Sequence, residues 1–166
     1  YGAPGDIVDV KLRKKRKSYA EGNIVNMVKP SDIRVEPKCE HFGTCGGCRW
    51  QHLPYEFQLK CKQQQVQDAL ERIGKIEIPE ITPILGSKNI WEYRNKMEYT
   101  FGDLVKDGEM TLGMHKKGHF MSIITVDECQ LVDEDFNKVA SITVTSKYSG
   151  NDSLVVVKLT DGGEIT

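Results

Sequence analysis

Residues 39–52 read CEHFGTCGGCRWQH and hold three of the five cysteines of the chain. Cys39, Cys45 and Cys48 follow the spacing C-x5-C-x2-C, and the Gly-Gly pair between the last two lets the backbone turn tightly. Two thiolates that lie two residues apart on such a turn can point at one metal centre. The stretch therefore predicts a cysteine-rich metal loop, and such a site needs a fourth ligand from elsewhere in the chain.

Two cysteines remain as sources of that fourth ligand. Cys61 falls on the polar face of a predicted helix, where we expect an ordinary, partly exposed thiol. Cys129 lies where a strand is expected to give way to a helix, so its side chain is able to point at a distant loop. We predict that the metal ligands are Cys39, Cys45, Cys48 and Cys129. Zinc is the alternative, because His41 and His52 are close enough in sequence to act as ligands.

The composition is that of a globular protein, with 39% hydrophobic and 28% charged residues in a chain of 166. No stretch is long and apolar enough to span a bilayer, and the sequence opens without a signal peptide or an initiator Met. We therefore expect a cytoplasmic monomer that makes no contact with membranes. In a reducing compartment, crowded thiols indicate a metal site more often than disulfides.

The net charge of −1 is unevenly distributed along the chain. Residues 1–38 carry nine Lys or Arg against five Asp or Glu, whereas residues 126–166 carry three against eight. A basic front indicates an anionic partner, and phosphate groups fit it best. The alternative is a solvated hairpin tip. The candidate phosphate contacts are Lys11, Arg13, Lys14, Lys15, Arg16 and Lys17.

Alternating apolar residues predict two strands near the front, over residues 5–12 and 19–28. The basic residues 13–18 between them are expected to form the turn of a hairpin. Residues 29–38 contain two prolines and read as a linker.

After the metal loop, an apolar stripe with helical spacing predicts a helix over residues 53–74, which Pro54 opens and Gly74 closes. Alternation then predicts a strand over residues 92–102, followed by a hairpin turn at Asp107–Gly108.

The last third is expected to hold two strands within residues 110–126, joined by a Lys-Lys-Gly turn. A short helix over residues 132–141 has Asp133 as its N-cap, and a strand covers residues 153–160. Residues 161–166 start a turn with no strand to complete it. We therefore expect a piece of a larger protein, incomplete at both ends.

The stretch CEHFGTCGGCRWQH resembles the cluster signature of the iron–sulfur RNA uracil-C5 methyltransferases. That family has C-x5-C-G-G-C, then an aromatic-Gln-His segment, and a fourth cysteine far downstream. Residues 50–52 match the segment, and Cys129 matches the fourth cysteine. The stretches YRNKMEYTFG and LGMHKKGHFMSIITVDECQL resemble two further segments of the family, and residues 4–25 are similar to the second half of a TRAM domain.

The resemblance implies an α+β fold. Residues 1–37 would form the C-terminal part of a TRAM-like, OB-like RNA-binding β-barrel, seen as a partial barrel hairpin. Residues 38–166 would form an iron–sulfur-bearing central domain, incomplete at its C-terminus, with an antiparallel sheet, helices and the metal loop. The resemblance also implies a [4Fe–4S] cluster on the four cysteines, and RNA contacts by the basic run and by Arg94 and Lys96 on one strand face.

The activity that the resemblance implies is S-adenosylmethionine-dependent methylation of a uracil in rRNA or tRNA. In that family a cysteine attacks uracil C6, the methyl group is transferred to C5, and a proton is then removed. This chemistry takes place in a C-terminal Rossmann-type domain. No glycine-rich strand–loop–helix in the present sequence matches that domain, so no catalytic residue is assigned.

Two other functions remain open from the residues alone. A non-catalytic zinc-binding RNA adaptor would also account for the basic hairpin and the thiols. An electron-transfer module of the ferredoxin type would account for the C-x2-C spacing, but the basic front and the long gap to Cys129 argue against it. The stretch HKKGH at residues 115–119 fits a phosphate contact and a solvated turn equally well.

Overall fold

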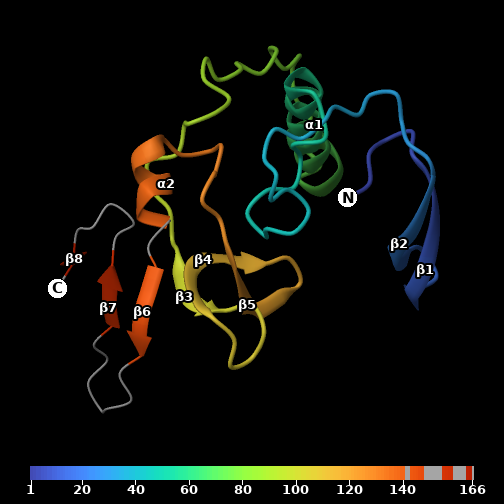
Figure 1. Ribbon diagram of the computed structural model, residues 1–166. Coiled ribbons are helices and arrows are strands. Elements are labelled where there is room, and N and C mark those ends of the chain that lie inside the picture. Colours follow the sequence, from blue (N-terminus) through green and yellow to red (C-terminus); the bar gives the residue numbers. More distant parts are fainter. Residues whose placement is uncertain (141–142, 148–154, 159–163, 166) are drawn as a thin grey trace. The chain divides into compact units, whose positions relative to one another are not determined.

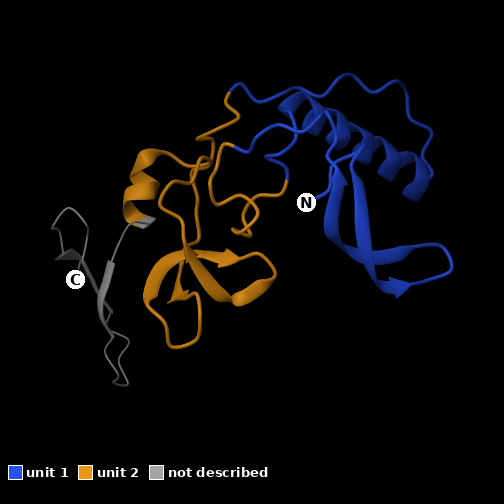
Figure 2. Ribbon diagram, turned by 45° about the vertical axis from the view of Figure 1, so that its right-hand side comes forward, with its two compact units in different colours: residues 1–37, 50–88 blue, residues 38–49, 89–166 orange. Residues whose placement is uncertain are grey.

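The computed structural model describes residues 1–140, 143–147, 155–158 and 164–165. The chain divides into two compact units, which Figure 2 colours separately. Unit 1 comprises residues 1–37 and 50–88, and unit 2 comprises residues 38–49 and 89–166. The fold is α+β, as predicted, with two antiparallel sheets and short helices (Figure 1). Within the described residues neither sheet closes into a barrel.

The hairpin predicted at the front of unit 1 is present. Strands β1 (Ile7–Lys15) and β2 (Ala20–Lys29) pair antiparallel, and the amide of Arg16 donates to the carbonyl of Tyr19 across the turn (2.8 Å). The turn predicted over residues 13–18 is wrong in its first half, because β1 continues to Lys15. Lys14 lies opposite Glu21 and Lys15 opposite Ala20, so the ladder runs three residues further than alternation of apolar residues indicates.

A buried carboxylate anchors the base of this hairpin. Asp6, whose side chain is only 3% exposed, accepts hydrogen bonds from the backbone amides of Ala3 and Ser31 and from the Arg34 guanidinium. The hydrogen bond from Arg34 holds the pKa of Asp6 well below its ordinary value, with the amides of Ala3 and Ser31 acting in the same direction, although burial opposes both. Asp6 thereby fixes the chain before β1 to the chain after β2.

The helix predicted in unit 1 is also present. It comprises α1 (Tyr55–Asp68) and a π-helical turn, η1 (Ala69–Ile73). Pro54 directly precedes the first helical residue and Gly74 directly follows the last, as the sequence indicates. The left-handed residue at this end is Lys75, with φ of 52°. No helix in the described ranges has the length and hydropathy needed to cross a membrane.

Unit 2 is built on an antiparallel sheet in which β4 pairs with both β3 and β5 (Figure 1). The strands are β3 (Thr100–Asp103), β4 (Met110–Lys116), β5 (His119–Thr125), β6 (Thr143–Lys147), β7 (Val155–Lys158) and β8 (Glu164–Ile165). The two strands predicted within residues 110–126 are therefore confirmed. Gly118 closes their turn with φ of 74°, a conformation that suits glycine.

The strand predicted over residues 92–102 is wrong over residues 92–99, because only Thr100 onward joins the sheet. Upstream, the amide of Glu92 donates to the carbonyl of Gln130 (3.1 Å). The amide of Arg94 donates to the carbonyl of Leu131 (2.9 Å). The segment is thus held beside the connection that follows β5 and forms no regular ladder there.

Arg94 and Lys96 consequently do not share a strand face. Both side chains are exposed, and Lys96 forms an ion pair with Glu98 at 2.6 Å. The hydrogen bond raises the pKa of Lys96 and lowers that of Glu98.

The end of the chain holds more strands than the sequence predicts. β6 is not among the predicted strands, and β8 pairs with β7 where the sequence predicts an unfinished turn. The strand predicted over residues 153–160 is present as β7, and its remaining residues lie outside the described ranges. The short helix is present as α2 (Glu134–Ala140), with the Asp133 carboxylate accepting hydrogen bonds from two amides of its first turn.

Candidate functional site

The cysteine loop of unit 2 is a tight turn held by its own backbone. The amide of Phe42 donates to the carbonyl of Cys39 (3.0 Å), and the amide of Cys45 donates to the carbonyl of His41 (2.8 Å). Gly43 has φ of 92°, in the left-handed region that favours glycine. These bonds fold the five residues between the first two cysteines back on themselves.

Two backbone hydrogen bonds join the loop to the end of β4 and to the turn that follows it. The amide of Gly46 donates to the carbonyl of His115 (3.0 Å), and the amide of Lys117 donates to the carbonyl of Thr44 (2.8 Å). A Cβ at position 46 would lie only 3.0 Å from the carbonyl oxygen of His115, so a side chain there would push the two segments apart. The β4–β5 hairpin therefore fixes the loop against the rest of unit 2.

The structure packs three of the predicted cysteines together in unit 2, which also contains Cys39. Cys45 and Cys48 are half-buried and pack against the core of unit 2, to which the buried Cys129 belongs. Burial raises the pKa of the Cys45 thiol, the hydrogen bond from the Gly47 amide lowers it, and the charges of Cys129 and the buried Cys39 raise it further. The amide of Gly47 donates to Sγ of Cys45 at 3.3 Å.

Cys129 lies between β5 and α2, the junction that the sequence predicts, and a side chain of α2 holds its backbone. Asn137 Oδ1 accepts a hydrogen bond from the amide of Cys129 (2.9 Å), and Asn137 Nδ2 donates to the carbonyl of Cys129 (3.2 Å). Sequence reasoning missed this residue, because the bond depends on how α2 packs after the connection. The only signal was an amide side chain on a short helix directly downstream.

The residues that could have served as other ligands belong to unit 1 or have other partners. Cys61 lies in α1 of unit 1. His52 is buried in unit 1, where its Nε2 bonds to the carbonyl of Gly2 (3.2 Å) and burial lowers its pKa. His41 bonds to the Asp127 carboxylate (3.2 Å). Among the residues that the structure describes, no three His, Cys, Asp or Glu side chains are arranged as ligands of one metal ion.

The candidate phosphate contacts fall into two sets. The residues at 11, 13, 14, 15, 16 and 17 are all exposed on the β1–β2 hairpin of unit 1. Pairing shifts between Leu12 and Lys14, so Arg13 is the extra residue of a β-bulge and the strand twists locally. Among the described residues, Lys14 forms a long, exposed ion pair with Glu21 (4.0 Å) and no other ion pair. Arg94 and Lys96 belong to unit 2, in the irregular segment before β3.

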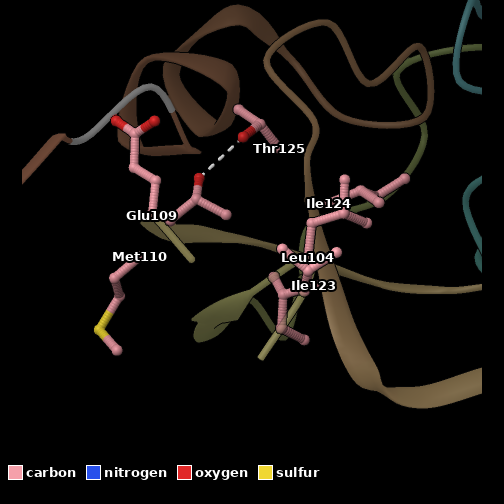
Figure 3. Close-up of a pocket in the computed structure, with 8 residues that line it drawn as sticks. Leu104, Glu109, Met110, Ile123, Ile124 and Thr125 are labelled. Carbon is pink, nitrogen blue, oxygen red and sulfur yellow. Dashed lines mark hydrogen bonds between the residues drawn. The ribbon is translucent and has the colours of Figure 1, made fainter. Parts of the chain in front are cut away.

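Unit 2 also has a hollow beside β4, with a volume of about 450 Å³. Figure 3 shows its lining, which consists mainly of apolar side chains from β5 and from the chain between β3 and β4. Its polar groups are the Glu109 carboxylate and the hydroxyls of Thr111 and Thr125, which bond to each other at 2.8 Å. The two hydroxyls bond to each other, so the Glu109 carboxylate is the polar side chain of the lining that is left to orient a ligand.

No protein-family model matches the chain. Individual relatives match it over most of its length. The chain is 38% identical to an uncharacterized RNA methyltransferase of Bacteroides thetaiotaomicron, over 98% of this chain and 38% of that protein. It is 46% and 47% identical to proteins of the same name from Caldanaerobacter subterraneus and Clostridium acetobutylicum, over 86% and 85% of this chain and 31% of each relative.

The chain thus spans between 31% and 38% of the length of these curated relatives. Identity at this level over nearly the whole chain reflects common descent. By sequence, the chain therefore belongs to the same family as these proteins named RNA methyltransferases, and it corresponds to one segment of them.

Proposed function

We propose that this chain is the RNA-recognition and [4Fe–4S]-binding segment of an S-adenosylmethionine-dependent RNA uracil-C5 methyltransferase acting on rRNA or tRNA. The observation that carries the proposal is the packing of Cys45 and Cys48, from one loop, against Cys129, from the distant connection before α2, within the unit that also contains Cys39. Homology to proteins named RNA methyltransferases supports the RNA part of the proposal.

The surroundings of the four cysteines suit an iron–sulfur cluster. Cluster sulfurs are stabilised by backbone amides that point at them and by exclusion of water. The amide of Gly47 already points at the Cys45 sulfur, and Trp91 and Met114 pack on the same core as Cys45 and Cys48. Cys39, Cys45, Cys48 and Cys129 would hold the cluster. When bound, it would link the cysteine loop to the connection before α2, which is a structural role.

The methylation itself is proposed for the part of the parent protein outside this segment. A base within folded RNA must leave its stack before its C5 and C6 atoms can be reached. The part played by the present chain is to bind the surrounding RNA through phosphate contacts, which the exposed basic hairpin of unit 1 is suited to make.

The test of the cluster uses the chain expressed and purified without oxygen and with ample iron. We expect a brown protein with broad visible absorption and with iron and acid-labile sulfide in equal amounts. Cys129→Ser should lose most of the iron. The matched control is Cys61→Ser, which removes a thiol from α1 of unit 1 and should keep the iron content of the wild type.

Two results would refute this assignment. A colourless protein with one tightly bound zinc would favour the zinc-binding RNA adaptor. Loss of iron in Cys61→Ser with retention in Cys129→Ser would mean that the fourth ligand is wrong.

A further inference from the structure

The start of β5, directly after the β4–β5 turn, carries an aromatic side chain that is largely exposed to solvent. Phe120 is 76% exposed and the next residue, Met121, is 83% exposed. The Phe120 ring is stacked on the ring of His115, with centroids 4.5 Å apart and planes 8° from parallel. We refer to residues 115–121 as the hairpin tip.

His115 is fixed behind Phe120 by two hydrogen bonds. Its Nδ1 lies 2.5 Å from the carbonyl oxygen of Phe120, and its Nε2 lies 3.3 Å from the hydroxyl of Thr100 on β3. A carbonyl only accepts, so the neutral ring with its proton on Nδ1 satisfies both bonds, and the Thr100 hydroxyl then donates to Nε2. One face of the Phe120 ring therefore packs on the His115 ring, which two hydrogen bonds hold in place. The high exposure of Phe120 leaves the other face of its ring to solvent.

The hairpin tip and the part of the cysteine loop that bonds to it carry no negative charge. The hairpin tip reads HKKGHFM, and residues 42–47 of the cysteine loop, which bond to it, read FGTCGG. Neither stretch contains an acidic residue. Lys116 makes no ion pair with any other residue that the structure describes, so its charge is available to a partner.

A planar apolar face beside positive charge fits one class of ligand well. Single-stranded RNA offers bases that stack on aromatic rings and phosphates that contact lysine. A protein partner would also cover Phe120, but it would not need the two lysines that lie a few residues before it in the chain. The cysteine loop holds the tip in place through the bonds at Thr44 and Gly46, so the tip does not have to be ordered when the ligand binds.

We propose that the hairpin tip is an RNA-binding site of its own, in which Phe120 stacks on one unpaired base and Lys116 and Lys117 contact the adjacent phosphates. The inference rests on the proposed RNA function, and it adds a contact that reads the presence of a base, where the β1–β2 hairpin contacts phosphate only.

The experiment measures binding of a short single-stranded oligouridylate to the chain as a function of salt. Phe120→Ala should weaken binding between about 5-fold and about 150-fold, the range for one base stacked on an aromatic ring, and it should leave the salt slope unchanged. Lys116→Gln should lower the log–log salt slope by roughly 0.7. Phe120→Trp should bind at least as tightly as the wild type. The matched control is Met121→Ala, which removes an equally exposed apolar side chain without a ring and should bind as the wild type does.

An abasic version of the same strand isolates the stacking contact. On that strand Phe120→Ala and the wild type should bind equally. If the wild type binds RNA but Phe120→Ala has no effect on either strand, the inference is wrong and the proposed function stands. If Phe120→Ala instead abolishes self-association or association with protein, the tip is a protein-docking surface and the inference is also wrong. No RNA binding by the wild type would refute both.

Discussion

Asn137 shows how a single side chain positions a candidate ligand. Its amide bonds to both the N–H and the C=O of Cys129, a residue that is itself buried. These two bonds fix the backbone of the cysteine to α2. A backbone group that loses its partner inside a protein retains the full cost of desolvation.

We therefore predict that Asn137→Ala destabilises unit 2 by about 1–3 kcal/mol, because one buried amide and one carbonyl lose their partners. Urea denaturation followed by a probe in unit 2 measures this change. Lys138→Ala is the matched control: it is the next residue in α2, its ion pairs are exposed, and its removal should cost less than about 1 kcal/mol. Equal effects of the two substitutions would show that Asn137 does not hold the connection.

The Asp6 carboxylate makes the stability of unit 1 dependent on pH. Its pKa in the folded chain is held below the ordinary value of 3.8, mainly by Arg34. The folded state thus favours the ionised form, and the resulting stability is complete above pH 3.8 and is lost as the pH falls below that value. We expect the thermal midpoint of unit 1 to fall steeply on acidification from about pH 4 downward.

Asp6→Asn tests this assignment of the pH dependence. The variant should melt lower than the wild type at neutral pH and should show a flatter dependence on pH below about 4. Asp9→Asn is the control, because the Asp9 carboxylate is exposed on β1 and bonds only to the Asn26 side chain among the described residues. A wild-type pH profile in the Asp6 variant would contradict the assignment.

The β1–β2 hairpin carries the basic residues of unit 1. Its basic residues lie partly within a strand, since β1 runs to Lys15, and the β-bulge at Arg13 interrupts the alternation of faces. The six side chains are thus presented from a twisted ribbon and its turn together.

We predict that changing Lys14, Lys15 and Arg16 to Gln weakens RNA binding and lowers the log–log salt slope by roughly 0.7 for each phosphate that is no longer neutralised. Fluorescence anisotropy over a range of salt concentrations measures both quantities. Far-UV circular dichroism should show little change, because all three side chains are exposed.

The control for this hairpin variant removes the same kind of charge elsewhere in unit 1. Lys60 and Lys62 are exposed on α1, and the double variant Lys60→Gln, Lys62→Gln should keep the RNA affinity and most of the salt slope of the wild type. If the helix and hairpin variants lose affinity in proportion to charge alone, the basic run is a solvated tip and not a binding element.

At the scale of the whole molecule, the predicted metal ligands all belong to unit 2, whereas the basic hairpin and α1 belong to unit 1. A metal centre that binds only the folded state stabilises the part of the chain that holds its ligands. The two units should therefore respond differently when iron is removed.

We predict that removing iron with a chelator lowers amide-exchange protection in β3, β4, β5 and α2, and leaves α1 and η1 unchanged. Hydrogen–deuterium exchange with mass spectrometry compares the two states in one experiment. The Cys129→Ser variant should resemble the chelated protein before any chelator is added. Equal loss of protection in both units would contradict the assignment of all four ligands to unit 2.

Several elements could be predicted from the sequence because neighbouring residues decide them. The β4–β5 turn follows from a glycine that adopts positive φ, and the start of α2 follows from the Asp133 cap. The helix of unit 1 follows from its apolar stripe between Pro54 and Gly74. In each case the signal and the structure lie within one or two turns of chain.

The wrong predictions fall where distant segments compete for the same backbone groups. Residues 92–99 alternate like a strand, yet Glu92 and Arg94 bond to the connection before α2 and not to β4. The basic stretch looks like a turn, yet pairing with Glu21 and Ala20 extends β1 into it. Alternation and charge describe one segment at a time, so neither could reveal these pairings.

The front hairpin, the helix of unit 1 and the spacing of the cysteine loop follow from the sequence alone, because local backbone preferences and side-chain periodicity decide them, and the α+β class follows from the family resemblance. Tertiary contacts decide which cysteine joins the loop: Cys129 packs with Cys45 and Cys48, and Cys61 lies in unit 1. Tertiary contacts also bond the β4–β5 turn to the cysteine loop and stack Phe120 on His115. These outcomes depend on segments far apart in the chain, and a one-dimensional pattern carries no information about which of several compatible contacts has the lowest free energy.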